Sequence, residues 1–213
     1  MFGLGAIFSG LSAVLGVVAK LVPAVVEIVG AKLLTLAKAL EAFFTILGLM
    51  KPDENVEEIG DKALQAEEDE LDPITVENSG SYEKYKERLD EYDRLDPEKS
   101  ALKTQDEKIQ KGLEVMMGVS LEKFGEPMAA LFPIILRDPA FYSTVGRLEG
   151  IGKVIQEDKD MLPNIVGYLS GKSSKTLEND KAFDALLNVE KLLYPSADKR
   201  ELENRVEDMR EKK

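Results

Sequence analysis

The chain of 213 residues has no cysteine, no histidine and no tryptophan. Without cysteine it forms no disulfides and offers no thiolate metal ligands. Without histidine it lacks the commonest general base and transition-metal ligand, and Ser-His or Cys-His catalysis is excluded. Forty acidic residues make close carboxylate pairs inevitable, so paired acids alone identify no site. We therefore assign no catalytic residue, no metal and no cofactor, and we expect a protein that is not an enzyme.

Charged residues are also scarce in the first fifty positions, and the first nineteen contain none. The five that occur there are Lys20, Glu27, Lys32, Lys38 and Glu41. At about 100° per residue, all of them except Lys32 lie on one face of a continuous helix. Such a helix is apolar nearly all round and has one narrow polar stripe. This pattern is typical of a helix in a membrane, in a large core or in an assembly of many copies.

The polar stripe of Lys20, Glu27, Lys38 and Glu41 has two interpretations. In the first, these side chains meet solvent on one face of a helix that packs on the rest of the protein. In the second, several copies place them toward one another or toward a water-filled lumen, because buried charges need partners. The second interpretation predicts a homo-oligomer.

Small residues are frequent at the start of the same segment. They include Gly3, Gly5, Gly10 and Gly16. Each glycine weakens a helix in water by up to about 1 kcal/mol, whereas at a helix interface or in lipid it allows close backbone approach. We therefore predict that these glycines mark helix contacts, although strict GxxxG spacing is absent.

Helical periodicity continues through the rest of the chain, and no segment shows a sustained period of two. Apolar residues follow helical spacing from about Ser81 to Arg94, from Gln105 to Phe124 and from Thr176 to Tyr194. Gly48 and Pro52 end the apolar segment, and Pro23 or Gly30 is expected to kink it or to turn it into a hairpin. The expected fold is all-α, with a long or kinked apolar N-terminal helix, or a helical hairpin, joined by an acidic linker to a small multi-helix body.

Charge is distributed unevenly between the expected regions. Residues 52–104 contain seven basic and eighteen acidic residues, so they account for −11 of the net charge of −12. The predicted division is an apolar helical region at 1–50, an acidic linker with a short helix capped by Asp53 at 51–80, an amphipathic body at 81–197 and a charged C-terminal helix at 198–213. The acidic surface argues against a nucleic-acid partner.

Two functions fit these features. The first is a membrane-associated protein that inserts its N-terminal region and forms homo-oligomers, including a pore-forming oligomer. The second is a structural subunit of a large homomeric assembly, such as a virion or secretion-type particle, with the apolar helix buried between copies. The predicted partners are further copies of the chain and either a lipid bilayer or apolar partner helices. No basic residue precedes the apolar segment, so we do not expect a secretory signal peptide.

Overall fold

The structure, a computed structural model, describes residues 4–171 and 176–210, together with their side chains except those of residues 4–9 and 176. All regular elements in these residues are α-helices, as the sequence predicted. They are α1 (Leu4–Val26), α2 (Ala31–Ile46), α3 (Val56–Glu67), α4 (Val76–Ser79), α5 (Tyr82–Asp90), α6 (Pro97–Ala101), α7 (Gln105–Phe124), α8 (Glu126–Arg137), α9 (Pro139–Tyr142), α10 (Arg147–Glu157), α11 (Met161–Leu169), α12 (Thr176–Leu193) and α13 (Lys199–Asp208).

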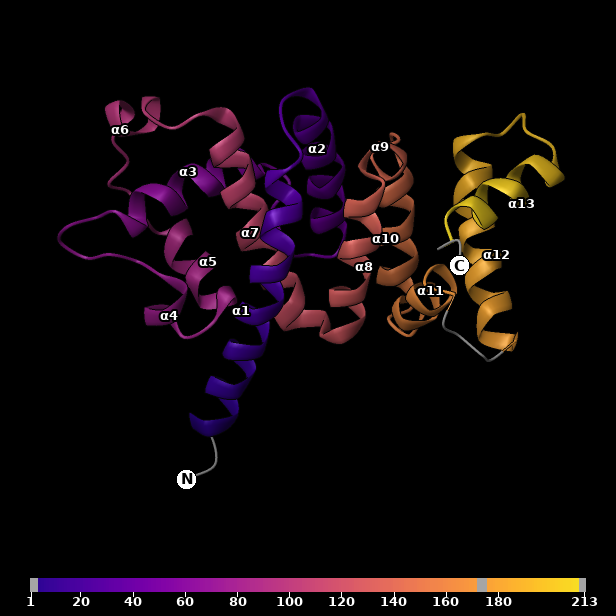
Figure 1. The fold of residues 1–213 in the computed structure, drawn as a ribbon, viewed down its shortest axis with the longest axis horizontal. Helices are drawn as coiled ribbons and strands as arrows, with labels where there is room; N and C mark the ends of the chain where they lie inside the picture. Colours follow the sequence, from indigo (N-terminus) through magenta and orange to yellow (C-terminus); the bar gives the residue numbers. More distant parts are fainter. Residues whose placement is uncertain (1–3, 172–175, 211–213) are drawn as a thin grey trace.

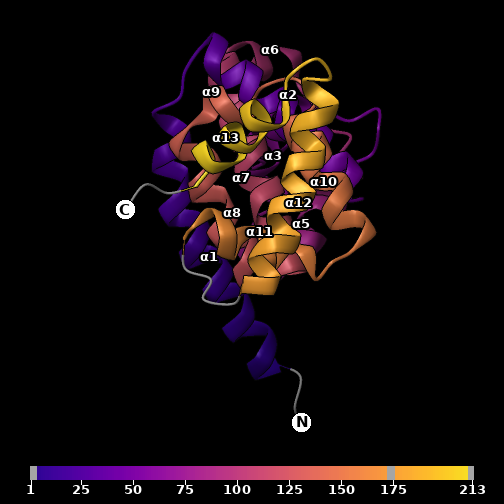
Figure 2. The same cartoon turned by 90° about the vertical axis from the view of Figure 1, so that its right-hand side faces the viewer.

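The helices form an elongated molecule whose two ends come from different parts of the chain (Figure 1). The chain starts near the middle with α1 and α2, continues to one end with α3–α6, and returns to the middle along α7. Helices α8–α13 then extend to the other end, where α11, α12 and α13 pack together. Figure 2, the view from that end, shows the start of α1 projecting beyond the other helices.

The apolar N-terminal region consists of two separate helices. Pro23 lies inside α1, and the chain turns at residues 27–30, where Gly30 has a φ of 60°. A positive φ is readily available to glycine because it has no Cβ. The Gly30 amide also donates a hydrogen bond to Asp106 Oδ2 (2.9 Å), which fastens the turn to the first turn of α7.

The segment expected to be an acidic linker is instead part of the packed protein. Helix α3 lies along α7, with Val56, Ile59 and Ala63 buried. Close approach is possible because Gly60 of α3 and Gly112 of α7 face the backbone of the opposite helix. The helix is capped by Asn55, which accepts a hydrogen bond from the Glu58 amide, and not by Asp53. Two of its acids, Asp61 and Glu67, are half-buried and form ion pairs with Lys108 and Lys111 of α7, so a high acidic content did not indicate a linker.

The apolar N-terminal region is likewise not separate from the body. One hydrophobic core extends from Leu11 in α1 to Met209 at the end of α13. Helix α2 contributes its fully buried apolar face, formed by Leu33, Leu36, Ala37, Leu40, Phe43 and Phe44. Among the helices with described side chains, none is long and apolar enough to cross a membrane. The apolar composition of residues 31–50 therefore reflects a core helix.

Several local predictions are confirmed. Helix α7 has the bounds that its periodicity predicted, and a capping box of Thr104 and Glu107 starts it. Of the three Asp-Pro pairs expected to start helices, those at 96–97 and 138–139 each begin a short helix, with the aspartate side chain accepting a backbone hydrogen bond. Asp72-Pro73 does not, because the next helix, α4, begins at Val76 and is capped by Thr75. The confirmed features depend on neighbouring residues alone, so they were visible in the sequence.

Candidate functional site

The four residues of the predicted polar stripe lie in different surroundings. Lys20 on α1, Glu27 in the following turn and Lys38 on α2 are exposed. Glu41 is half-buried, and its Oε1 accepts a hydrogen bond from the Val56 amide at the start of α3 (2.9 Å). Burial raises the pKa of Glu41, and this effect exceeds the opposing effects of the Val56 hydrogen bond and of the Lys38 charge. Within the described part of the chain, no ion pair joins any two of the four.

Helix α1 has an inner face that belongs to the core. Leu11, Val18, Leu21 and Val25 are buried where α1 contacts α7 and α8. Their spacing of seven, three and four residues places them along one side of the helix, as an amphipathic helix requires. The apolar side chains of α1 are therefore partly explained by packing within one molecule.

The outer face of α1, as we call it below, consists of small or charged residues that remain exposed. It is formed by Ser12, Ala13, Gly16, Ala19, Lys20 and Pro23. A Cβ added at Gly10 or at Gly16 would have no atom of the protein within 4 Å. These two predicted contact glycines thus face open space in the single chain. Gly5 lies in α1 without described surroundings, and Gly3 lies outside the described residues.

Apolar side chains are also exposed where α1 ends. The side chains of Val26 and Val29, on either side of the exposed Glu27, are 48% and 59% exposed. Single exposed valines are common on protein surfaces. Val26 lines a pocket with Val22 of α1 and Gln110 of α7, and Val29 lies in the turn after the helix, so the two valines add exposed apolar surface beside the end of α1.

A charged pocket of about 670 Å³ lies between α5, α7 and the segment that joins α2 to α3. At its wall, Lys86 Nζ is 2.9 Å from Glu54 Oε1 and 2.7 Å from Asp90 Oδ1, and Lys51 Nζ is 3.1 Å from Asp90 Oδ2. Burial tends to raise the pKa of Asp90, but the hydrogen bonds and charges of Lys86 and Lys51 outweigh it, and the pKa is lowered. Because these charges are mutually paired, the cluster serves to hold α5 against the segment before α3.

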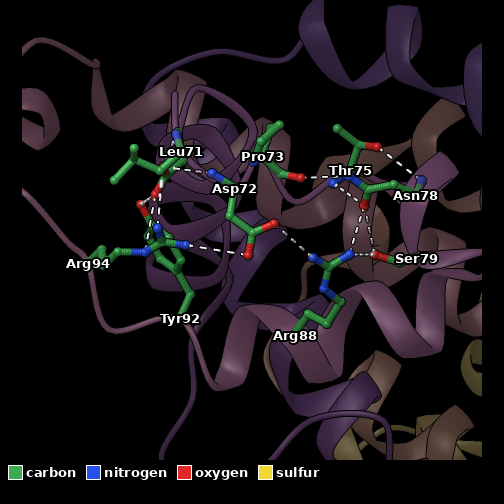
Figure 3. A network of polar contacts seen from close by, with 10 residues as sticks. Leu71, Asp72, Pro73, Thr75, Asn78, Ser79, Arg88, Tyr92 and Arg94 are labelled. Carbon is green, nitrogen blue, oxygen red and sulfur yellow. Dashed lines mark hydrogen bonds and ion pairs between the residues drawn. The ribbon is translucent and has the colours of Figure 1, made fainter.

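A second polar network fastens the segment between α3 and α5 (Figure 3). The Asp72 carboxylate lies between two arginines, with Arg88 Nη2 at 3.8 Å and Arg94 Nη2 at 3.7 Å. The Asn78 side-chain amide donates to the Pro73 carbonyl (2.6 Å). All of these groups satisfy one another, and the side chain of Asp72 is 65% exposed. The network has a structural role.

The most deeply buried charges form a bidentate pair that the sequence did not reveal. Arg147 Nε and Nη2 donate to the two carboxylate oxygens of Glu190 at 2.7 and 2.9 Å, and both side chains are at most 1% exposed. The guanidinium also donates to the Phe141 carbonyl and lies over the Phe141 ring at 3.8 Å. The pair connects α10 to α12. Nothing local in the sequence distinguishes these two residues from the many charged residues at the surface.

Within the described residues, no group of three or more carboxylates is placed to hold a metal ion. Comparisons with protein-family models, with curated proteins and with solved structures found no match for this chain.

Proposed function

We propose that this protein acts by self-association and not by catalysis, as a helical subunit that contacts other copies through the outer face of α1. The observation that carries this proposal is the exposed strip of small residues on the most hydrophobic helix, from Ser12 to Pro23. Small residues allow two helix backbones to approach closely, which increases the number of van der Waals contacts between them. A helix that served only the core of one chain would gain solubility from charged residues at these positions.

Charge on the same face supports an antiparallel pairing of two α1 helices. Lys20 and Glu27 are seven residues apart, which corresponds to about 10 Å along a helix axis. Glu27 lies in the turn directly after α1, where its amide still donates to the Pro23 carbonyl (3.2 Å), so it continues the side of the helix that carries Lys20. A two-fold axis near Pro23 would bring Lys20 of each copy to Glu27 of the other. An isologous contact of this kind is self-complementary and closes at two copies, and further surfaces would be needed for a larger assembly.

The size of the particle tests this proposal. Gly16→Leu adds a bulky side chain in open space, so the fold is retained while two α1 helices are held apart. We expect sedimentation velocity to show an oligomer for the unaltered protein and a monomer for Gly16→Leu. Gln156→Leu, which also places a leucine at an exposed helical position, controls for added apolar surface and should leave the oligomer intact. A monomeric unaltered protein at micromolar concentrations would refute the proposal.

A second candidate function is membrane association through the start of α1. It is favoured by the projection of the first turns of this helix beyond the other helices (Figure 1) and by the absence of charge from residues 4–9. The test is flotation with liposomes of the full chain and of a chain lacking residues 1–9. This deletion spares α2, whose removal would take Leu33, Leu40 and Phe43 from the core. If both chains float equally, or neither floats, the start of α1 is not a membrane anchor.

A further inference from the structure

An apolar pocket of about 270 Å³ lies between α2 and the segment that joins α9 to α10. Its apolar wall includes Leu34, Ala39 and Ala42 of α2 and Leu148 of α10. The volume is slightly below the ~300 Å³ at which drug-sized ligand pockets begin. The pocket therefore suits a molecule of modest size.

The pocket forms where the side chains of α2 are short. One turn beyond it, Gly152 of α10 contacts Phe43 and Ile46, and a Cβ on this glycine would lie 3.2 Å from Phe43. The two helices are thus tightly packed at that level. At the pocket, α2 presents alanines, whose short side chains do not reach the segment at Ser143–Gly146, so space is left between the elements.

The polar groups of the pocket leave one cation without a carboxylate partner. Glu149 at the rim is already paired with Lys153, at 2.6 Å. Lys38, on the α2 wall, forms no ion pair within the described part of the chain. The Lys38 charge acts on the Glu41 carboxyl one turn along α2, but its ammonium group is hydrogen-bonded to no carboxylate in the described residues, which favours an anionic ligand group there.

Two further residues of the pocket wall, Ser143 and Val145, have a polarity or an exposure that a bound ligand would explain. Ser143 on the loop wall is 8% exposed, and its hydroxyl has no hydrogen-bond partner among the described residues. A buried hydroxyl without a partner is costly, and Ser143 lines the pocket, so a ligand oxygen is the missing partner that this site could accept. Val145 beside it is 91% exposed, so the rim offers additional apolar surface.

We propose that this pocket binds a small amphipathic carboxylate, with its apolar part between Ala39 and Leu148 and its carboxylate at Lys38 and the Ser143 hydroxyl. The shared chemistry is one carboxylate on a compact apolar group. Such a group could be a short alkyl chain or an aromatic ring. This site is independent of self-association, because none of its residues lies on the outer face of α1.

Three straight-chain probes test the ligand class by ligand-observed NMR on the full-length protein. Hexanoate should bind with a Kd of about 1 mM or tighter, which is reasonable for eight non-hydrogen atoms. Hexanamide has the same shape without the charge, and acetate has the charge without the chain, so both should bind at least about tenfold more weakly. Benzoate, in a parallel titration, distinguishes an aromatic from an alkyl ligand. Equal binding of hexanoate and hexanamide would overturn the proposal. Failure of both hexanoate and benzoate to bind would also overturn it.

Variants test whether the binding occurs at this pocket. Lys38→Gln should weaken hexanoate binding about tenfold, whereas Lys32→Gln, a matched change at an exposed position of α2 outside the pocket, should not. Ser143→Ala should weaken binding without lowering the free energy of unfolding, because it removes a hydroxyl that lacks a partner. Ala39→Leu should fill the space and abolish binding. Unchanged affinity in Lys38→Gln and Ala39→Leu, with the thermal transition retained, would place the ligand elsewhere and refute the assignment.

Discussion

Gly60 of α3 and Gly112 of α7 lie opposite each other where the two helices cross, and neither position has room for a side chain. A Cβ at Gly60 would overlap the Lys108 carbonyl oxygen, and one at Gly112 would overlap the Val56 carbonyl oxygen. The obstacle in both cases is backbone, which cannot rotate away as a flexible side chain can. The crossing therefore depends on these two glycines.

We expect Gly60→Ala to lower the free energy of unfolding by about 3 kcal/mol or more, at the upper end of the effects of overpacking. Gly16→Ala, which adds the same methyl group in open space on α1, should be neutral or stabilise the helix by up to about 1 kcal/mol. Urea denaturation followed by circular dichroism measures both. Equal stability of the two variants would show that α3 and α7 are not so closely packed.

The Arg147–Glu190 pair should be costly to break and less costly to replace. Arg147→Met leaves the Glu190 carboxylate buried without its partner, so a loss of about 3–5 kcal/mol is expected. The double variant Arg147→Met with Glu190→Leu removes both charges and should recover a large part of this loss. The double-mutant cycle is measured by chemical denaturation. Additive losses would contradict a direct pairing of the two charges.

An exposed ion pair provides the comparison for that cycle. Lys153 and Glu149 are only 2.6 Å apart, but their side chains remain 58% and 43% exposed. Solvent screening reduces the value of such a pair to roughly 0–1 kcal/mol. We therefore expect Lys153→Met to change stability by less than about 1 kcal/mol.

Asp90 should contribute to the pH dependence of stability. Its pKa is lowered in the folded protein relative to the ordinary value of 3.8, so its contribution is fully present above that value. The contribution is lost as the pH falls below 3.8 through the folded pKa, because the protonated carboxyl no longer pairs with Lys86 and Lys51. Stability should thus fall less steeply below about pH 4 in Asp90→Asn than in the unaltered protein.

Denaturant titrations at a series of acidic pH values test this expectation. Asp93→Asn, an equivalent change at an exposed position three residues away, is the control and should retain the steep decline. If Asp90→Asn and the unaltered protein lose stability in parallel, the cluster of Lys51, Lys86 and Asp90 is not responsible for acid sensitivity.

Charge reversal tests the antiparallel arrangement of α1 helices. Lys20→Glu places like charges opposite each other across the proposed contact, and so does Glu27→Lys, so each should weaken self-association at least about tenfold. The double variant restores opposite charges and should recover association. Lys181→Glu, at an exposed position of α12, controls for net charge.

Sedimentation equilibrium at low and high salt measures these effects. Salt should weaken association of the unaltered protein and lessen the penalty in the single variants, because ions screen exposed charges. If the loss of association free energy in the double variant equals the sum of the losses in the two single variants, the antiparallel pairing is excluded. Other contacts through α1 would then remain to be tested.

The sequence by itself determined the helical class, the bounds of α7 and the helix starts at Asp96 and Asp138. These features depend on residues within one or two turns of each other, and their periodicity and side-chain chemistry appear directly in the chain. Only the tertiary structure decided that α2 is a core helix and that α3 packs against α7 and is not part of a linker. An apolar face looks the same whether lipid, another copy or the same chain covers it.

The same limit applies to individual residues. Glu41 was grouped with Lys20 by helical spacing, yet the turn at Gly30 breaks that spacing, and Glu41 contacts the start of α3. The partners of Arg147 and Gly60 lie 43 and 52 positions away along the chain, so no local pattern could show them. Burial and pairing are decided by which surfaces meet when the helices pack, and in this protein the helices that meet are distant in sequence.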